Sequence, residues 1–397
     1  MYIYIEKIVY DYKEKNYEAI IDFQSQNELS EVMSTLNIRP IPYENKSLIV
    51  LRNLHFLKNK FKESCWYKID TSFFRNFQVE DIFTENDSII CSLYKPHSFK
   101  IDKELYHEEK ELNMNTSLNE ISIEKSLLYN DPIFSNISDD DLKLIVRDVG
   151  CGNWNEVVSG DFKLIYDMGA DTHFIKSTKR TIVEHAEVTS PYILVLSHWD
   201  IDHYNLIKHL SDDELLNIRY FVAPSNIPNT LEAQNVLSRL VSFNIPLNLI
   251  TFAHSPYKRI DLFRVLNLPY LDIYRSSCGK RPNNSGIVLT FKNNDNLVIL
   301  PGDHYYNQLL RAVMDRNKKH IMVVPHHGGY AGMFKKVTWQ NYAFINGAMS
   351  TRHKKYSTNF PLPHIHNFFI TGLSWSCINC PREDVTWSPN NDVMIQF

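Results

Sequence analysis

The residues best suited to chemistry stand between 197 and 203, where the sequence reads Ser-His-Trp-Asp-Ile-Asp-His directly after the apolar run Tyr192–Ser197. Four side chains that can bind a metal, His198, Asp200, Asp202 and His203, fall within six positions. A loop that leaves a strand can direct His198 and Asp200 to one point and Asp202 and His203 to a neighbouring point. That arrangement predicts half-sites for two cations about 3.5–4 Å apart. The alternative is a polar turn in which Asp202 caps the following helix.

Two later clusters also follow predicted strands. Gly302-Asp303-His304 comes after Asn296–Leu300, and a carboxylate at Asp303 could bridge two metals with its two oxygens. His326 and His327 come after Ile321–Val324 and precede two glycines. The spacing leaves open which of these two histidines binds metal, and we favour His326. The order of strand and ligand, repeated three times, predicts one composite metal site.

The elements that must position these loops change in character along the chain. Residues 1–100 mix strand-like runs with one helical segment and predict a small α+β accessory or interaction domain. Residues 101–142 carry three Lys and eleven Asp or Glu, a composition typical of an acidic linker. Residues 143–397 alternate apolar strands with helical patterns, which predicts an α/β domain that carries the metal site and a C-terminal extension.

Composition restricts the function further. The 397 residues have a formal net charge of -4, which excludes polybasic nucleic-acid binding but not a phosphodiester held at a local site. Residues 1–140 carry 16 Lys and Arg against 24 Asp and Glu, so the remainder is the more positive part. We expect no membrane span. The six scattered cysteines predict reduced thiols and a cytoplasmic location. Residues 1–140 could bind a protein partner.

The ordered motifs resemble the metallo-β-lactamase fold superfamily, and within it the branch typified by the soluble domain of DNA-uptake (ComEC-type) proteins. The resemblance spans about residues 143–370. It rests on Asp148-Val-Gly-Cys-Gly-Asn153, Asp167-Met-Gly169, the His198–His203 motif, Asn283–Leu289 before Gly302-Asp303, Pro325–Gly329, and more loosely Ser350 to His364. It implies a four-layer αβ/βα sandwich that binds two divalent metals at one edge. The sequence departs from the pattern at Asn153, where the branch has Asp, and near Asn267, where the superfamily has a third histidine.

The resulting hypothesis is a divalent-metal-dependent hydrolase, foremost a phosphodiesterase or nuclease. His198 and Asp200 would form one site, Asp202, His203 and His326 or His327 the other, with Asp303 between them. A hydroxide held by the two metals would attack the substrate, which is a nucleic acid or another phosphodiester. We expect Zn²⁺ or Mn²⁺, with Mg²⁺ as a further option, because Asp200 adds a hard oxygen ligand. His304, His353 and His364 are the candidate proton donors.

Two other functions stay open at this point. The enzyme could hydrolyse another ester or a lactone. Alternatively, the chain could be a trigger-dependent or catalytically weak component of a multi-protein, defence-type assembly, with residues 1–140 binding the partner.

Overall fold

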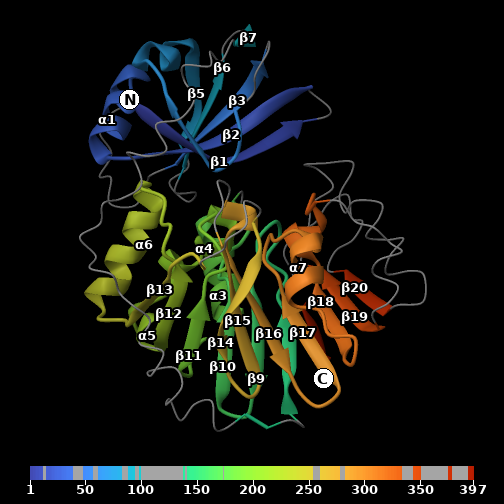
Figure 1. Cartoon of the computed structure of the whole chain (residues 1–397). Helices are drawn as coiled ribbons and strands as arrows, with labels where there is room; N and C mark the ends of the chain where they lie inside the picture. The colour runs from blue at the N-terminus through green and yellow to red at the C-terminus, as the bar shows by residue number, and fades with distance from the viewer. Residues whose placement is uncertain are drawn as a thin grey trace.

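The N-terminal part of the chain forms a sheet of its own (Figure 1). The computed structural model describes residues 1–11, 15–38, 48–56, 61–82, 88–93, 98–99, 137–138, 141–172, 174–253, 260–277, 282–332, 343–349, 374–377 and 392–397. The sheet has the order β4-β1-β2-β3-β6-β5, and β7 pairs with β3. Its elements are β1 (Tyr2–Asp11), β2 (Asn16–Phe23), α1 (Gln26–Thr35), β3 (Leu48–Phe56), β4 (Cys65–Lys68), η1 (Thr71–Asn76), β5 (Phe77–Ile82), β6 (Ser88–Leu93) and β7 (Ser98–Phe99).

Helix α1 covers this first sheet. Ser25 caps the helix by accepting a hydrogen bond from the backbone N–H of Glu28. Leu29, Val32 and Met33 recur at helical spacing and are buried with Ile3, Ile21 and other strand side chains. Residues 1–99 therefore have a hydrophobic core of their own.

The second sheet has the order β13-β12-β11-β10-β9-β8-β21. Strands β10, β11, β12 and β13 run parallel to one another, so their carboxyl ends lie at the same edge. The elements of this part are β8 (Lys143–Val146), β9 (Asn155–Ser159), β10 (Phe162–Tyr166), α3 (Lys176–His185), β11 (Tyr192–Val195), α4 (Ile201–Tyr204), η5 (Ile207–His209), α5 (Asp212–Leu216), β12 (Ile218–Pro224), α6 (Leu231–Ser242), β13 (Leu247–Ile250) and β21 (Val393–Gln396).

The third sheet has the order β14-β15-β16-β17-β18-β19-β20. It begins as antiparallel hairpins and continues from β17 as parallel strands. Its elements are β14 (Leu262–Asn267), β15 (Leu271–Ser276), η6 (Pro282–Asn284), β16 (Ile287–Lys292), β17 (Asn296–Leu300), α7 (Tyr306–Ala312), β18 (Lys319–Val323), η7 (Pro325–Gly328), β19 (Ala343–Met349) and β20 (Ser374–Cys377).

The packing of apolar side chains defines four layers after residue 141. One cluster lies between the two sheets and joins Leu164 and Val195 of the second to Leu289 and Val298 of the third. Another cluster joins the opposite side of the second sheet to helices α3 and α6. A third packs α7, through Leu309 and its neighbours, on the outer side of the third sheet. The predicted four-layer αβ/βα sandwich with a smaller N-terminal α+β domain is thereby confirmed.

The N-terminal domain lies over one end of this sandwich (Figure 1). Ile20 and Val50 are buried in the cluster that contains α3 and α6, and Leu231 of α6 joins the core of the first domain. Asp22 accepts a hydrogen bond of 2.9 Å from the backbone N–H of Glu232. Most of the predicted linker at 101–142 lies outside the described residues. Within the described part of the chain, no helix has the length and apolar character that a membrane crossing requires.

Candidate metal centre

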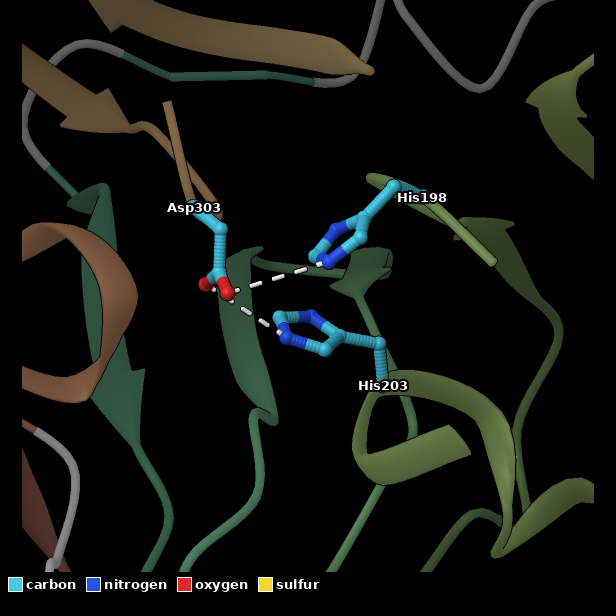
Figure 2. A group of neighbouring side chains, drawn as sticks. All are labelled: His198, His203 and Asp303. Atoms are coloured by element: carbon cyan, nitrogen blue, oxygen red, sulfur yellow. Dashed lines mark ion pairs between the residues drawn. The ribbon is translucent and has the colours of Figure 1, made fainter. Parts of the chain in front are cut away.

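The predicted ligand loops meet at the end of the sandwich that the N-terminal domain covers. The segment His198–His203 follows β11, Asp303 follows β17, and His326 and His327 follow β18. Strands β17 and β18 run parallel, so the loops after them emerge at the same edge of the third sheet, and close contacts with Asp303 bring His198 and His203 of the second sheet to that edge. Figure 2 shows His198, His203 and Asp303 pointing toward one another.

Asp303 lies between two pairs of histidines. Its Oδ1 is 3.5 Å from Nε2 of His203 and 3.9 Å from Nε2 of His327. Its Oδ2 is 3.8 Å from Nε2 of His198 and 3.3 Å from Nε2 of His326. The carboxylate therefore presents one oxygen to each pair, as a ligand that bridges two ions would.

Asp200 and Asp202 each lie next to a different one of these two histidine pairs. Asp200 places Oδ2 at 3.3 Å from Nε2 of His198, whereas Asp202 places Oδ2 at 3.7 Å from Nε2 of His327. Two groups of donor atoms are close enough to hold an ion, namely His198 with His203 and Asp303, and Asp202 with His203 and His327.

His326 and His327 thus occupy different places. The sequence argument favoured His326 as the partner of Asp202 and His203, but the structure puts the buried His327 there. His326 instead faces the Asp303 oxygen that also faces His198. Its Nε2 could therefore join His198 and Asp200 as a third ligand, and second imidazole nitrogen, of the same ion. Asn267, the residue at the expected third-histidine position, contacts Asp272 on β15 instead.

Asp167, directly after β10, orients two of the histidines through hydrogen bonds on the Nδ1 side of their rings, opposite the proposed metal ligand atom Nε2. Its Oδ2 accepts from Nδ1 of His203 at 2.8 Å and from Oγ of Ser197 at 2.8 Å. Oγ of Ser197 in turn lies 2.9 Å from Nδ1 of His198. When Nδ1 carries the proton in each ring, the lone pair of Nε2 is free to bind a metal ion placed between the ring and the Asp303 carboxylate. His326 follows the same rule, because its Nδ1 lies 2.8 Å from the backbone oxygen of Tyr330.

The backbone of these loops adopts conformations that few residues tolerate. Asp167, His326 and His327 have φ angles of 61°, 54° and 50°, in the left-handed region. Gly169 is required because a Cβ atom there would lie 2.0 Å from the backbone oxygen of Asp202. The peptide N–H of Met168 donates to the oxygen of His203 at 2.8 Å, which ties the loop after β10 to the ligand motif.

The site concentrates charge in a buried space. Burial opposes ionisation of Asp202, yet Lys7, His203 and His327 hold its pKa below the usual range. Burial also opposes ionisation of Asp303, but His326, His203 and His198 keep the pKa of Asp303 well below normal. The pKa of His203 is raised despite burial, because Asp167 and Asp303 favour its charged form. These carboxylates need positive charge nearby, which divalent cations provide.

The donor atoms fit a metal in a further respect. Nε2 of His198 and Oδ1 of Asp303 are buried and make no hydrogen bond within the described part of the structure. Buried polar atoms are nearly always satisfied, so such atoms require a partner. Imidazole and carboxylate ligands together suit Zn²⁺ and Mn²⁺.

Two contacts from the N-terminal domain were not predicted from the sequence. Lys7 donates to Oδ2 of Asp202, and Ser64 donates to Oδ1 of Asp200 at 2.9 Å. The pairing of β1 with β2 shifts between Ile5 and Lys7, and such a bulge re-aims side chains near sites. The only sequence signal was the Glu6-Lys7 pair within an otherwise alternating strand.

Other candidates have different roles from those expected. His304 is buried, with Nδ1 at 2.9 Å from the oxygen of Pro301, and burial lowers its pKa to about 3, so it is poorly suited to deliver a proton. Arg275 is buried and donates to the backbone oxygens of Ile250 and Gly286, so its charge is not available to a substrate. Asn153 donates to Oδ2 of Asp167 at 2.6 Å, which an aspartate could not do. His353 and His364 lie outside the described residues.

Comparisons with known proteins find similarity in structure alone. No family model matches the chain, and no curated protein matches it. A metallo-beta-lactamase fold protein of Bacillus subtilis, YhfI, is 10% identical with a TM-score of 0.37, over 59% of this chain and 96% of that one. A diphosphatase of the PhnP family is 10% identical with a TM-score of 0.32, over 59% and 94%. The long form of yeast RNase Z is 12% identical with a TM-score of 0.30, over 83% and 56%.

The four layers and the position of the ligand loops define the class. The chain has a four-layer αβ/βα sandwich with a candidate metal centre at one end, and an N-terminal domain covers that end.

Proposed function

We propose that this protein is a divalent-metal-dependent hydrolase, and that its substrate is a phosphodiester of the kind found in nucleic acids and nucleotides. The observation that carries the proposal is the position of Asp303, whose two oxygens face two separate pairs of histidines. A shared carboxylate between two clusters of donors is typical of centres that hold two ions. The ComEC-type motifs of the sequence favour the same reading.

The ligands divide into two sets in this proposal. His198, Asp200 and His326 would hold one ion, and Asp202, His203 and His327 the other, with Asp303 shared. Bound divalent ions would supply Lewis acidity and lower the pKa of water toward about 7. Three aspartates leave two such ions with net positive charge, which suits an anionic substrate.

The remaining residues support this chemistry from the chain itself. Asp167 and Ser197 fix the rings of His203 and His198, so that the ligand atoms need little reorganisation. Lys7 places an ammonium group beside Asp202, where it can attract a phosphate oxygen. His364 and His353 remain proposed proton donors, whereas the buried His304 is the least suited of the three.

The proposal is tested by incubating the full chain with single-stranded and double-stranded DNA and RNA, in Mn²⁺ or Zn²⁺. Asp303→Asn serves as the inactive variant, because it keeps the shape of the side chain but removes the charge. We expect cleavage of at least one substrate by the wild type and at least a hundredfold less by the variant. Intact substrates in every case, with metal verified in the wild-type protein, would reject the proposal.

The contacts of the N-terminal domain also support a second candidate, a hydrolase that acts only when triggered. Lys7 and Ser64 reach Asp202 and Asp200 from a domain that lies over the ligand loops. A partner that moves this domain would change access to the centre. Pull-down with the full chain, followed by cleavage assays with any captured partner, distinguishes this candidate from a constitutive enzyme.

A further inference from the structure

A cavity of about 440 Å³ lies between the N-terminal domain and the candidate metal centre. Its volume falls within the range of about 300–1,000 Å³ typical of sites for small molecules. Both domains contribute to its wall. The aromatic residues that line it are Tyr10, Tyr17 and Phe61 from the first domain and Tyr305 and Tyr330 from the second.

These aromatic rings form one contacting pair in each domain. The ring centres of Tyr10 and Tyr17 lie 4.8 Å apart, and those of Tyr305 and Tyr330 lie 6.1 Å apart. Tyr330 is 62% exposed, although it is a large aromatic side chain at a cavity wall. Tyrosine rings on two sides of a small cavity suit a flat aromatic ligand, because they offer faces and edges for stacking.

The cavity reaches the metal centre through two polar residues. His326 lines it and places Nε2 at 3.3 Å from Oδ2 of Asp303. Asn283 also lines it and donates to the same oxygen at 3.3 Å. A ligand in the cavity would therefore have its other end next to the proposed ions.

The polar residues of the cavity complement a nucleotide. Lys62 is an exposed cation that can attract a phosphate. Glu63 accepts a hydrogen bond of 2.9 Å from the backbone N–H of Ile8. It can also accept a hydrogen bond from the amino group of a base. An aromatic ring joined to an anion satisfies all of these groups together.

We propose that this cavity binds one nucleobase of the substrate, with the adjoining phosphate at the metal centre. The inference rests on the proposed function and assigns a specificity role to the N-terminal domain, which supplies Tyr10, Tyr17 and Phe61. The base could belong to a small nucleotide or to the end of a single strand. A base paired inside a duplex is not accessible to a cavity of this kind.

The test is calorimetric titration of the full, metal-loaded chain with adenosine 5′-monophosphate and with ribose 5-phosphate. Neither ligand contains a phosphodiester, so binding is measured without turnover. We expect the mononucleotide to bind at least fivefold more tightly, because stacking of one base corresponds to about 5- to 150-fold in affinity. Equal affinity for the two ligands would overturn the inference, and it would do so even if phosphodiesters are cleaved.

Tyr330→Ala connects the preference to the cavity. Its exposure makes the substitution compatible with folding. The ratio of the two affinities should fall at least threefold in this variant. Leu216→Ala on α5, at the same 62% exposure but away from the cavity lining, should keep the wild-type ratio. An unchanged ratio in Tyr330→Ala would count against the cavity as the site.

Competition then identifies the source of the base. Displacement of the mononucleotide by a dinucleotide but not by a single-stranded decamer indicates a small nucleotide, and displacement by both indicates a strand end. Either result supports the inference. Displacement by a blunt duplex but by neither single-stranded ligand would overturn it. A base preference without any phosphodiester cleavage would reject the proposed function instead.

Discussion

Replacing Asp167 by Asn tests whether hydrogen bonds from Asp167 orient the histidine ligands of the metal centre. The carboxylate of Asp167 is fully buried and accepts hydrogen bonds from the backbone and hydroxyl of Ser197, from Asn153 and from His203. Asn has nearly the same shape and tolerates the left-handed φ of 61° at this position. The change therefore alters hydrogen bonding with little effect on the backbone.

The magnitude follows from these contacts. A carboxylate has two acceptor oxygens, but an amide has only one. The NH₂ group of Asn would therefore face at least one group that now donates a hydrogen bond to Asp167. If the NH₂ group replaces Oδ2, His203 loses the acceptor of its Nδ1 proton, and if it replaces Oδ1, Nδ1 faces an uncharged and weaker acceptor than the carboxylate. Loss of such an outer partner typically lowers metal affinity about 10- to 100-fold, or about 1.4–2.8 kcal/mol. We expect a further cost of about 1–3 kcal/mol to the free energy of unfolding, because a buried donor is left unsatisfied.

The assay is competition for Zn²⁺ between the protein and a chromophoric chelator, with circular dichroism to verify the fold. Asp295→Asn is a suitable control, because this aspartate is exposed in the turn between β16 and β17 and also exchanges a carboxylate for an amide. It should bind metal as the wild type does. If Asp167→Asn keeps both its fold and its wild-type affinity, Asp167 does not orient the centre.

Three further predictions concern the domain contact and the ligand loops. Lys7→Met should lower the melting temperature of the metal-free protein, because the buried Asp202 loses its cation at a cost of up to about 3 kcal/mol. The decrease in melting temperature should be smaller with saturating Zn²⁺. An equal decrease with and without metal would contradict this prediction. Burial raises the pKa of Asp22 from 3.8 to about 8, so Asp22 stabilises the fold fully at low pH and this stability is lost as pH rises toward 8, at up to about 1.4 kcal/mol per pH unit. Denaturation at pH 6 and 8 should show this slope in the wild type but a smaller one in Asp22→Asn; identical slopes would refute it. Gly169→Ala should unfold or strongly destabilise the chain, since its Cβ would meet the Asp202 backbone, and a melting temperature within 2 °C of wild type would exclude that clash.

The ligand loops could be predicted from sequence because their signal is local. Each is a polar cluster directly after an apolar strand, and parallel strands bring such clusters to one edge. Asp303, more than 100 positions after His198, was assigned to the same site from the repeated order of strand and ligand, because β11 and β17 belong to different sheets. The α/β character of the second domain followed from the alternation of strand and helix after residue 142, whereas its four layers were implied by the resemblance of the ordered motifs to a known superfamily.

Other features depend on tertiary contacts that no local pattern encodes. The different positions of His326 and His327 arise from consecutive left-handed residues in η7, which turn the two rings to different sides of Asp303. The contact of Lys7 with Asp202 joins residues 195 positions apart and depends on a bulge in β1. Arg275 lies on a buried strand and binds backbone oxygens, which its charge alone does not predict.

The most direct measurement of the central claim is the number and position of metal ions in crystals of the loaded protein, determined by anomalous scattering. We predict two ions, one on each side of the Asp303 carboxylate. One lies near His198 and His326, and the other lies near His203 and His327. A structure of saturated protein with no ion in contact with Asp303 would contradict it.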